Sequence, residues 1–294
     1  MKIDLFDDEM FEDEPQPAER PPREPRRRRG SGETAKRVLV ALPWIAFAIA
    51  ITVAGGVVFA LAMVALGIVA IREYAAVASR YRPLLIPAYA SVAALIAAAY
   101  LGSAFNVLYV VAATIPLLFA FAADARHREG ATVSLGVTLL GVLWIGIPLA
   151  HAVFLRELPD HGAALLIDVL VGTFVADTAA YATGRMFGSH KIAPNLSPNK
   201  TIEGLIGGFV IGTMGFWFAG LYQDWLSGVD ALMIGAAVAA VAPIGDLFES
   251  LLKRDLGTKD TGTLFGPHGG LLDRLDAVFF TVVVGYYLAV AVVY

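Results

Sequence analysis

The sequence predicts an all-α, polytopic integral membrane protein, and both its composition and the spacing of its apolar runs support this fold class. Hydrophobic residues make up 57% of the 294 residues, charged residues make up 16%, and the mean hydropathy is +0.68. Soluble domains carry about 25% charged residues. Apolar runs near the ~20 residues that a helix needs to cross a bilayer recur along the chain. These observations exclude a water-soluble globular protein.

Residues 1–37 are expected to form a disordered cytoplasmic tail. Acidic residues dominate the first 14 positions, prolines follow, and Arg26 to Arg29 form a basic run. A polar, biased segment of this kind cannot bury a core. We interpret the arginines as a topology signal, with contact to anionic lipid as the alternative. A cleaved signal peptide is disfavoured, because the first apolar run begins only near Val38 and is too long.

About nine transmembrane helices are expected after the tail. The first apolar block, 38–71, is too long for one span, and Gly55-Gly56 is the expected break between two short helices. The remaining candidate spans are 84–101, 103–123, 132–152, 162–184, 202–226, 229–252 and 272–294.

Lysine and arginine are distributed unevenly between the loops. If the N-terminus is cytoplasmic, the inner loops contain twelve of these residues and the outer loops contain only Arg156. Such a bias is typical of the cytoplasmic side. We therefore expect the polar segments 185–201 and 253–274 to face the cytoplasm, where nucleotides are available. The absence of cysteine excludes disulfides and thiolate metal sites.

The segment from Ser250 to Asp276 reads SLLKRDLGTKDTGTLFGPHGGLLDRLD and lies between two strongly apolar runs. Where this segment begins, a helical spacing of i, i+3, i+4 and i+7 places four polar side chains on one face of a helix. They are two acids, a hydroxyl and an amine: Asp246, Glu249, Ser250 and Lys253. Asp273 and Asp276 share a face at the start of the last run. Several glycines between Lys253 and Asp273 allow backbone amides to approach an anion closely.

A second polar segment, Asp177 to Gly204, reads DTAAYATGRMFGSHKIAPNLSPNKTIEG. Asp177 lies inside an apolar run, where an ionisable group is costly and indicates either a function or pairing with a neighbouring helix. The loop after it offers donors suited to phosphate oxygens, namely Arg185, His190, Lys191, Ser197, Lys200 and Thr201. Topology alone would explain one basic loop, but the second one favours phosphate binding.

Both segments resemble the signature of the phosphatidate cytidylyltransferases, the CDP-diacylglycerol synthases. The later segment has the spacing S-L-L-K-R-x4-K-D-x-G-x2-F-G-x-H-G-G-L-x-D-R-L-D, and the earlier one has D-T-x-A-Y, G-R, F-G, H-K and S-P-x-K-T-x-E-G. The resemblance is specific over 177–276. It implies N-terminal helices over 38–160, a catalytic region over 161–294 with cytoplasmic loops at 185–201 and 253–271, and transfer of CMP from CTP to phosphatidic acid.

The resemblance also implies Mg²⁺, because an attack of one phosphate on another brings two anions together. Acidic residues of similar enzymes at the positions of Asp246 and Asp273 bind the metal. Asp177, Glu249 and Asp276 are further candidate ligands, and helix pairing or capping is the alternative for each acid. Whether a second metal ion or a monovalent cation also binds is left open by the resemblance.

Four residues form the expected catalytic set: Lys253, Lys259, Asp260 and His268. The lysines would hold the triphosphate or the lipid headgroup, Asp260 would orient Lys259 or join the metal set, and His268 would donate to a phosphate or shuttle a proton. The expected substrate-binding set contains the six donors of the earlier loop together with Ser250, Arg254, Gly269, Gly270 and Arg274. Snorkelling lysines and a Ser250 that joins helices are the structural alternatives.

The expected partners are CTP, phosphatidic acid and membrane lipids, with no nucleic acid. Similar enzymes imply a homodimer in the plasma membrane of a bacterium. A cytidylyltransferase for another lipid phosphate is the main alternative, since the polar motifs do not read lipid tails. An ion-coupled transporter is disfavoured, because no inverted repeat is evident and the conspicuous acids lie near one face. His127, His151 and His161 lie outside both motifs and are interpreted as surface residues.

Overall fold

The computed structural model describes residues 31–123, 130–194, 196–262 and 269–294, with side chains from residue 43 onward. The chain divides into two units, Met1–Ile45 and Ala46–Tyr294. In the first unit only the beginning of helix α1 (Ser31–Ala54) is described, and it starts within the expected tail. The disorder of the tail therefore stays a prediction. The description below concerns the second unit.

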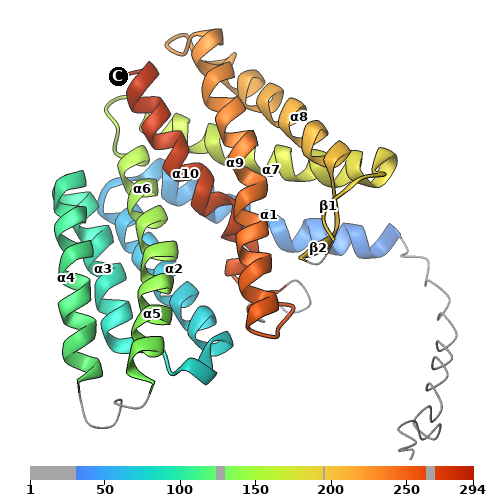
Figure 1. Cartoon of the computed structure of the whole chain (residues 1–294). Coiled ribbons are helices and arrows are strands. Elements are labelled where there is room, and N and C mark those ends of the chain that lie inside the picture. Colours follow the sequence, from blue (N-terminus) through green and yellow to red (C-terminus); the bar gives the residue numbers. More distant parts are fainter. Residues whose placement is uncertain (1–30, 124–129, 195, 263–268) are drawn as a thin grey trace, which may run out of the picture. The chain divides into compact units, whose positions relative to one another are not determined.

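In the described residues of this unit, the regular structure is helical apart from one hairpin, which confirms the predicted all-α class (Figure 1). The strands β1 (Lys191–Ala193) and β2 (Ser197–Thr201) pair antiparallel between two long helices. After α1 the helices are α2 (Gly56–Val77), η1 (Ser79–Tyr81), α3 (Leu85–Leu101), α4 (Ala104–Ala122), α5 (Ala131–Gly141), the π-helical η3 (Val142–Gly146), α6 (Ile147–Arg156), α7 (Gly162–Phe187), α8 (Ile202–Gly220), α9 (Gly228–Asp255) and α10 (Leu272–Val292).

Each predicted apolar segment is helical over most of its length. Among the described residues, seven helices are long and apolar enough to cross a membrane, and α5, η3 and α6 count together as one of them (Ala131–Arg156). The other two predicted spans correspond to shorter apolar helices, Pro43–Ala54 and Leu85–Leu101. The polytopic class is confirmed, while the number of nine spans stays a prediction.

The break at Gly55-Gly56 occurs where the sequence places it, because both glycines adopt positive φ angles of 62° and 51°. The end of α6 holds this corner: Arg156 donates to the carbonyls of Thr52 and Val53, and Glu157 Oε1 accepts from the Gly56 amide at 2.9 Å. A Cβ on Gly55 would lie 1.9 Å from the Arg156 guanidinium. The positive φ angle therefore favours glycine at position 55, and any larger residue there would also displace the Arg156 guanidinium.

An aromatic core joins the helices whose ends carry the polar motifs. Trp144, in η3, makes edge contacts with Phe248 of α9 and Phe279 of α10, at centroid distances of 5.3 and 6.0 Å, and with Tyr74 of α2 at 6.1 Å. Pro148 follows η3 and lacks an amide to bond the Trp144 carbonyl, which accounts for the irregular turn. This packing fixes α2, α9 and α10 against one another.

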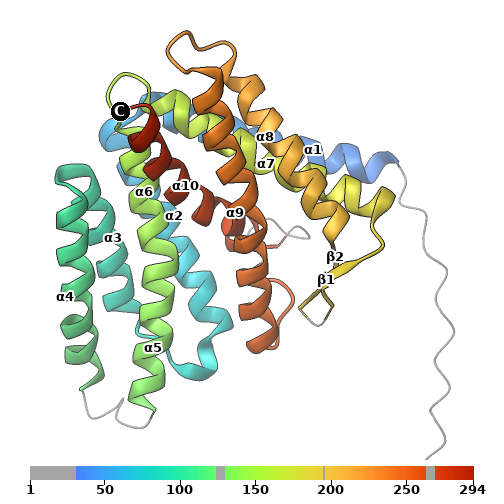
Figure 2. The ribbon, with the colours of Figure 1, turned by 45° about the horizontal axis from the view of Figure 1, so that its top comes forward.

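Helices α7 and α8 pack closely through small residues (Figure 2). A Cβ on Gly212 of α8 would lie 2.5 Å from the Ala176 Cβ of α7, and one on Gly208 would lie 2.8 Å from the Ala180 Cβ. Small residues at such positions allow membrane helices to approach at backbone distance. The hairpin β1–β2 joins the ends of α7 and α8, so this tight pair determines where the hairpin lies.

Basic residues of the described part of the second unit collect at one end of the helices, with Arg156 at the opposite end. Two contacts join neighbouring segments at this end: Arg80 donates to the Asp255 carbonyl at 2.7 Å, and Arg254 donates to the Leu196 carbonyl at 3.4 Å. At the opposite end the Tyr294 hydroxyl bonds the Pro159 carbonyl. We call the first end the basic end.

The interpretation of His151 as a surface residue is wrong, whereas His161 is half-buried and that interpretation is not contradicted. His151 is 6% exposed, its Nδ1 lies 2.8 Å from the Ile147 carbonyl, and its ring packs on Phe154 and Tyr286. His161 stacks on Trp225, with ring centroids 4.0 Å apart. Both face neighbouring helices or loops, which a pattern of motifs does not reveal. His127 lies outside the described residues.

Candidate active site

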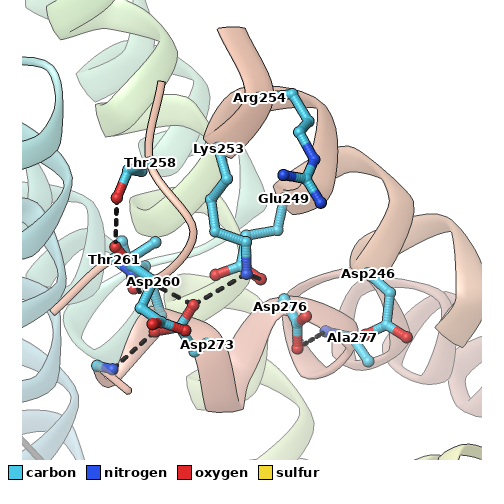
Figure 3. Close-up of polar contacts among 12 residues, drawn as sticks. Asp246, Glu249, Lys253, Arg254, Thr258, Asp260, Thr261, Asp273, Asp276 and Ala277 are labelled. Carbon is cyan, nitrogen blue, oxygen red and sulfur yellow. Dashed lines mark hydrogen bonds and ion pairs between the residues drawn. The ribbon is translucent and has the colours of Figure 1, made fainter. Parts of the chain in front are cut away.

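The polar residues of the two sequence motifs meet at the basic end of α7, α9 and α10. Figure 3 shows the side chains of Asp246, Glu249 and Lys253 directed from α9 towards Asp273 and Asp276 of α10. The predicted face of α9 is therefore formed, and it faces the start of α10 rather than the open surface.

Lys253 bridges the two helices. Its Nζ donates to Glu249 Oε2 at 2.7 Å within α9 and to Asp273 Oδ1 at 2.9 Å across to α10 (Figure 3). The Glu249 side chain is 2% exposed and that of Lys253 is 18% exposed. A buried carboxylate is costly when it is unpaired, so Lys253 stabilises both acids and offsets part of their charge.

Lys200 makes a second bridge, from β2 to α9. Its Nζ donates to Asp246 Oδ2 at 2.7 Å and approaches the Pro243 carbonyl at 3.5 Å. Asp177 of α7 is close enough to interact electrostatically with both Asp246 and Lys200. The acid that lies alone in the sequence therefore belongs to this group.

Asp276 lies between the two bridges. Its carboxyl group interacts with those of Asp246 and Glu249, and Figure 3 shows it next to Asp246. The helix backbones approach closely here, since a Cβ on Gly245 would lie only 2.3 Å from the Asp276 carbonyl oxygen. The sequence pairs Asp246 with Asp273, whereas the structure places Asp276 beside Asp246 and connects Asp273 through Lys253.

These contacts form one continuous group, which we call the polar row: Asp177, Lys200, Asp246, Asp276, Glu249, Lys253 and Asp273. It runs from α7 across α9 to α10. It contains five acids and two lysines, so the acids exceed the charge that the lysines supply. Such a group is suited to a bound cation and to the phosphates that accompany it.

The chemistry of the polar row fits Mg²⁺. Glu249 Oε1 is buried and receives no hydrogen bond from a donor in the described residues, and its neighbour is the Asp276 carboxyl group. Carboxylates gathered in this way repel one another, and a hard cation with oxygen ligands offsets that repulsion. Within the described ranges, no three acids or histidines stand assembled as a ready-made ligand group. The metal assignment therefore stays a prediction.

Asp273 also holds the segment between α9 and α10. Its Oδ2 accepts from the Gly270 amide at 2.7 Å and from the Thr261 amide at 3.0 Å. Gly269, just before, has a φ angle of +89°, and a Cβ there would lie 2.6 Å from Asp273 Oδ2. The predicted glycines thus bring backbone amides to an anion, but the anion in the structure is the Asp273 carboxylate. His268 lies outside the described residues.

Glu203, in the first turn of α8, holds the loop after α7 in place. It accepts from the Ser189 amide at 3.0 Å and from His190 Nδ1 at 2.7 Å. Thr201 is buried and caps α8, since its Oγ1 accepts from the Gly204 amide at 3.1 Å. The contacts of His190 and Thr201 thus stabilise the loop, and their predicted contact with substrate is untested.

The remaining predicted residues surround the polar row. Arg185 bonds the Tyr181 hydroxyl at 3.1 Å, and the Arg254 contact with Leu196 links the end of α9 to the hairpin. The exposed members of this set are Arg185, Lys191, Arg254, Lys259, Asp260 and Arg274, and the half-buried ones are Ser197 and Ser250. Gly269 and Gly270 are buried beside Asp273.

Glu73 of α2 is the residue that the sequence analysis missed. Its Oε2 accepts from the Leu272 amide, at the start of α10, at 3.1 Å. The only signal in the sequence is an acid beside Arg72 at the end of the second apolar run. Its partner lies 199 positions away, so spacing could not indicate the contact.

Fold and site together define a class: an α-helical membrane protein that presents, at one end of its helices, acids and lysines suited to phosphates and a divalent cation. Residues 35–292 match the model of the cytidylyltransferase family, and the chain belongs to that family. The match covers most of the chain and confirms the family resemblance of the two motifs.

Individual relatives agree with the family. The chain is 42% identical over 140 residues to the phosphatidate cytidylyltransferase of Thermotoga maritima, which covers 45% of this chain and 52% of that protein. It is 33% identical over 154 residues to that of Bacillus subtilis (strain 168), covering 52% and 57%. It is 34% identical over 197 residues to the uncharacterized protein YnbB of Escherichia coli (strain K12), covering 64% and 66%. The chain thus spans about half the length of these two phosphatidate cytidylyltransferases.

Proposed function

We propose that this protein is a phosphatidate cytidylyltransferase. A phosphate oxygen of phosphatidic acid forms a bond to the α-phosphorus of CTP, and the bond from that phosphorus to the oxygen bridging the β-phosphate breaks. The bonding electrons leave with pyrophosphate, and CDP-diacylglycerol is the lipid product. The attacking phosphate is ionised at neutral pH, so this reaction needs no general base.

The observation that carries this proposal is the polar row. It joins acids from α7, α9 and α10 to Lys200 and Lys253 at the basic end, within the region that matches the family. A reaction between two anions needs fixed cations and a metal more than it needs acid or base chemistry. The row offers both in one place, next to apolar helices that can present a lipid.

Asp246, Asp276 and Glu249 are the residues that would hold Mg²⁺, because the Asp276 carboxyl group interacts with those of both Asp246 and Glu249, and Glu249 Oε1 accepts no hydrogen bond within the described residues. When bound, this ion supplies positive charge for the phosphate oxygens and helps to orient them. Asp177 would add negative charge near Lys200. Asp273 would keep Lys253 and the neighbouring backbone in place.

Lys200 and Lys253 would bind phosphate oxygens of the two substrates. Each lysine is held by a carboxylate at 2.7 Å, which fixes its position before substrate arrives. A polyanion then competes with these ion pairs for the ammonium groups. The exposed cations at the rim, Arg185, Lys191 and Lys259, would raise the local concentration of anionic substrate.

We further propose that the basic end faces the cytoplasm, because lysine and arginine are enriched there and CTP is a cytoplasmic metabolite. A homodimer is expected from similar enzymes and stays a prediction.

A direct assay tests this function. Purified protein in phosphatidic acid vesicles should convert CTP into CDP-diacylglycerol when Mg²⁺ is present, and should form no product when the metal is removed with a chelator. ATP, GTP and UTP serve as matched nucleotide controls. Absence of any lipid-linked cytidine nucleotide under all metal conditions would refute the proposal.

The second candidate is cytidylyl transfer to a different lipid phosphate, because the contacts of the polar row are polar and none of them distinguishes one lipid tail from another. The polar row would recognise the phosphate of either lipid. Parallel assays with phosphatidic acid and a polyprenyl phosphate discriminate the two, because each candidate predicts product from only one lipid.

A further inference from the structure

Glu73 lies outside both sequence motifs, yet it contacts the start of α10. It is half-buried at the end of α2 and accepts the Leu272 amide at 3.1 Å. The first amides of a helix have no partners within the helix, and a negative charge there is stabilising. Glu73 therefore fixes the end of α10 that carries Asp273 and Asp276.

The same carboxylate lies against both described ends of the segment between α9 and α10. A Cβ on Gly262 would lie 2.5 Å from Glu73 Oε1, and a Cβ on Gly270 would lie 2.5 Å from Oε2. The carboxylate can occupy this position only because both neighbours are glycine.

Asp273 binds the same two stretches of backbone through the amides of Thr261 and Gly270. Thr261 is 7% exposed, so its backbone is enclosed as well. The two acids, Glu73 and Asp273, thus hold residues 261–262 and 270–272 between them. Since Asp273 also accepts from Lys253, the contacts of Glu73 lead directly to the polar row.

The corner after α2 makes one more contact of this kind. Arg80 of η1 donates to the Asp255 carbonyl, at the end of α9, at 2.7 Å. A cation at the C-terminus of a helix and an anion at the N-terminus of the next both complement the helix dipoles. The N-terminal helices thus contact α9 and α10, two of the helices that carry the polar row.

We propose that Glu73 is a positioning residue for the cytidylyl transfer, a role that rests on the proposed function. In this role Glu73 acts through the backbone and Asp273 rather than on the substrate itself. It sets the place of Asp273, and through Asp273 that of Lys253, by fixing the backbone at Thr261, Gly270 and Leu272.

The test compares Glu73→Ala and Glu73→Gln with Glu157→Ala as a matched control. Glu157 Oε1 accepts the Gly56 amide at the start of α2 at 2.9 Å, which is the same kind of contact at the opposite end of the helices. Amide hydrogen exchange is measured in peptides that contain Thr261, Gly270 and Leu272. Exchange there should accelerate in Glu73→Ala and remain unchanged in Glu157→Ala. Unchanged exchange in Glu73→Ala would overturn the proposal.

Kinetics separate positioning from simple stabilisation. Glu73→Ala should lower kcat by about 10- to 100-fold and raise the Mg²⁺ concentration needed for half-maximal rate, as loss of a supporting residue does at metal sites. Glu73→Gln, which keeps an acceptor oxygen, should recover part of kcat. Glu157→Ala should lower only the thermal midpoint. If Glu73→Ala lowers the midpoint but has wild-type kcat and Mg²⁺ dependence, the contact is merely structural and the proposal fails.

These readouts also separate this inference from the proposed function. A wild-type protein that makes no cytidine lipid would refute the function. Hydrogen exchange and the Mg²⁺-induced shift of the thermal midpoint, which need no turnover, would then still decide the role of Glu73. A Mg²⁺-induced shift that is the same in wild type and Glu73→Ala would contradict it.

Discussion

Each lysine of the polar row has a carboxylate partner, and the most buried partner is Glu249. Removing one member of a buried ion pair leaves an uncompensated charge, which costs about 3–5 kcal/mol. Single substitutions in the row therefore affect stability as well as chemistry. The predictions at this scale are designed to separate the two effects.

Replacing Asp276 by Asn should abolish most activity without unfolding the protein. The change removes one of three neighbouring like charges, so the thermal midpoint should stay the same or rise, while kcat should fall by about 100-fold or more. Asp230→Asn, at the opposite end of α9 where Asp230 accepts from Ser227 Oγ at 2.6 Å, is the control. Near-normal kcat in Asp276→Asn would remove Asp276 from the site.

Replacing Lys253 by Ala should reduce both stability and turnover, because Glu249 and Asp273 lose their shared cation. Adding Glu249→Gln should restore much of the thermal midpoint, since one of the unpaired charges is then neutral, but it should not restore turnover. Thermal unfolding and initial rates of the single and double variants form a double-mutant cycle. Recovery of turnover together with stability would show that Lys253 is only structural.

Sequence spacing predicted which residues share one face of a helix. It did not predict which faces of two neighbouring helices contact each other. Asp246, Glu249 and Lys253 do lie on one side of α9, as their i, i+3 and i+7 spacing requires. Asp273 and Asp276 fall one turn apart on α10, and the close approach at Gly245 decides which of them meets Asp246. That approach depends on tertiary packing, so spacing could not show that Asp276 lies beside Asp246, and the metal pair Asp246 and Asp273 stays a prediction.

At the scale of elements, the contact between α9 and α10 is the feature that assembles the row. Gly245→Ala would place a Cβ 2.3 Å from the Asp276 carbonyl oxygen and should force the helices apart. We expect a loss of about 1–3 kcal/mol of stability, typical of overpacking, together with reduced turnover. The control is Gly136→Ala in α5, where a Cβ meets no atom within 4 Å and helix propensity predicts a small gain. Equal behaviour of the two variants would contradict the close approach.

Helix ends could be predicted only where the sequence contains a clear break. Gly55-Gly56 gave the correct boundary, whereas the segment predicted at 202–226 ends as a helix at Gly220. Beyond it Gln223 donates to Asp168 at 2.7 Å and Trp225 stacks on His161, so the chain turns back onto α7. The apolar residues Trp225 and Leu226 raised the hydropathy and concealed this turn.

At the scale of the whole molecule, the separation of charge predicts its orientation in the membrane. The chain has no cysteine, so single cysteines can be introduced without background. A membrane-impermeant maleimide should label Asp224→Cys in intact bacterial cells and Asn199→Cys only in inside-out vesicles, because both positions are exposed but lie at opposite ends. The reverse pattern would place the basic end outside and would contradict the access of CTP to the site.

Composition was sufficient to predict the polytopic membrane class, because burial in lipid requires long apolar runs, whereas the number of nine spans stays a prediction. The contribution of the N-terminal helices to the site was not predictable in this way. Glu73 reaches α10 over 199 positions, and the family motifs do not include it. A contact of this range is visible only once the helices are packed.

The central claim is that the polar row transfers the cytidylyl group of CTP, and the fate of each CTP phosphate tests it most directly. Vesicles of phosphatidic acid are incubated with wild-type protein, Mg²⁺ and CTP labelled at either the α- or the γ-phosphate. We predict that the α-label enters the lipid and the γ-label appears in pyrophosphate, and that both transfers are lost in Asp276→Asn. Entry of the γ-label into lipid, or of neither label, would contradict the account.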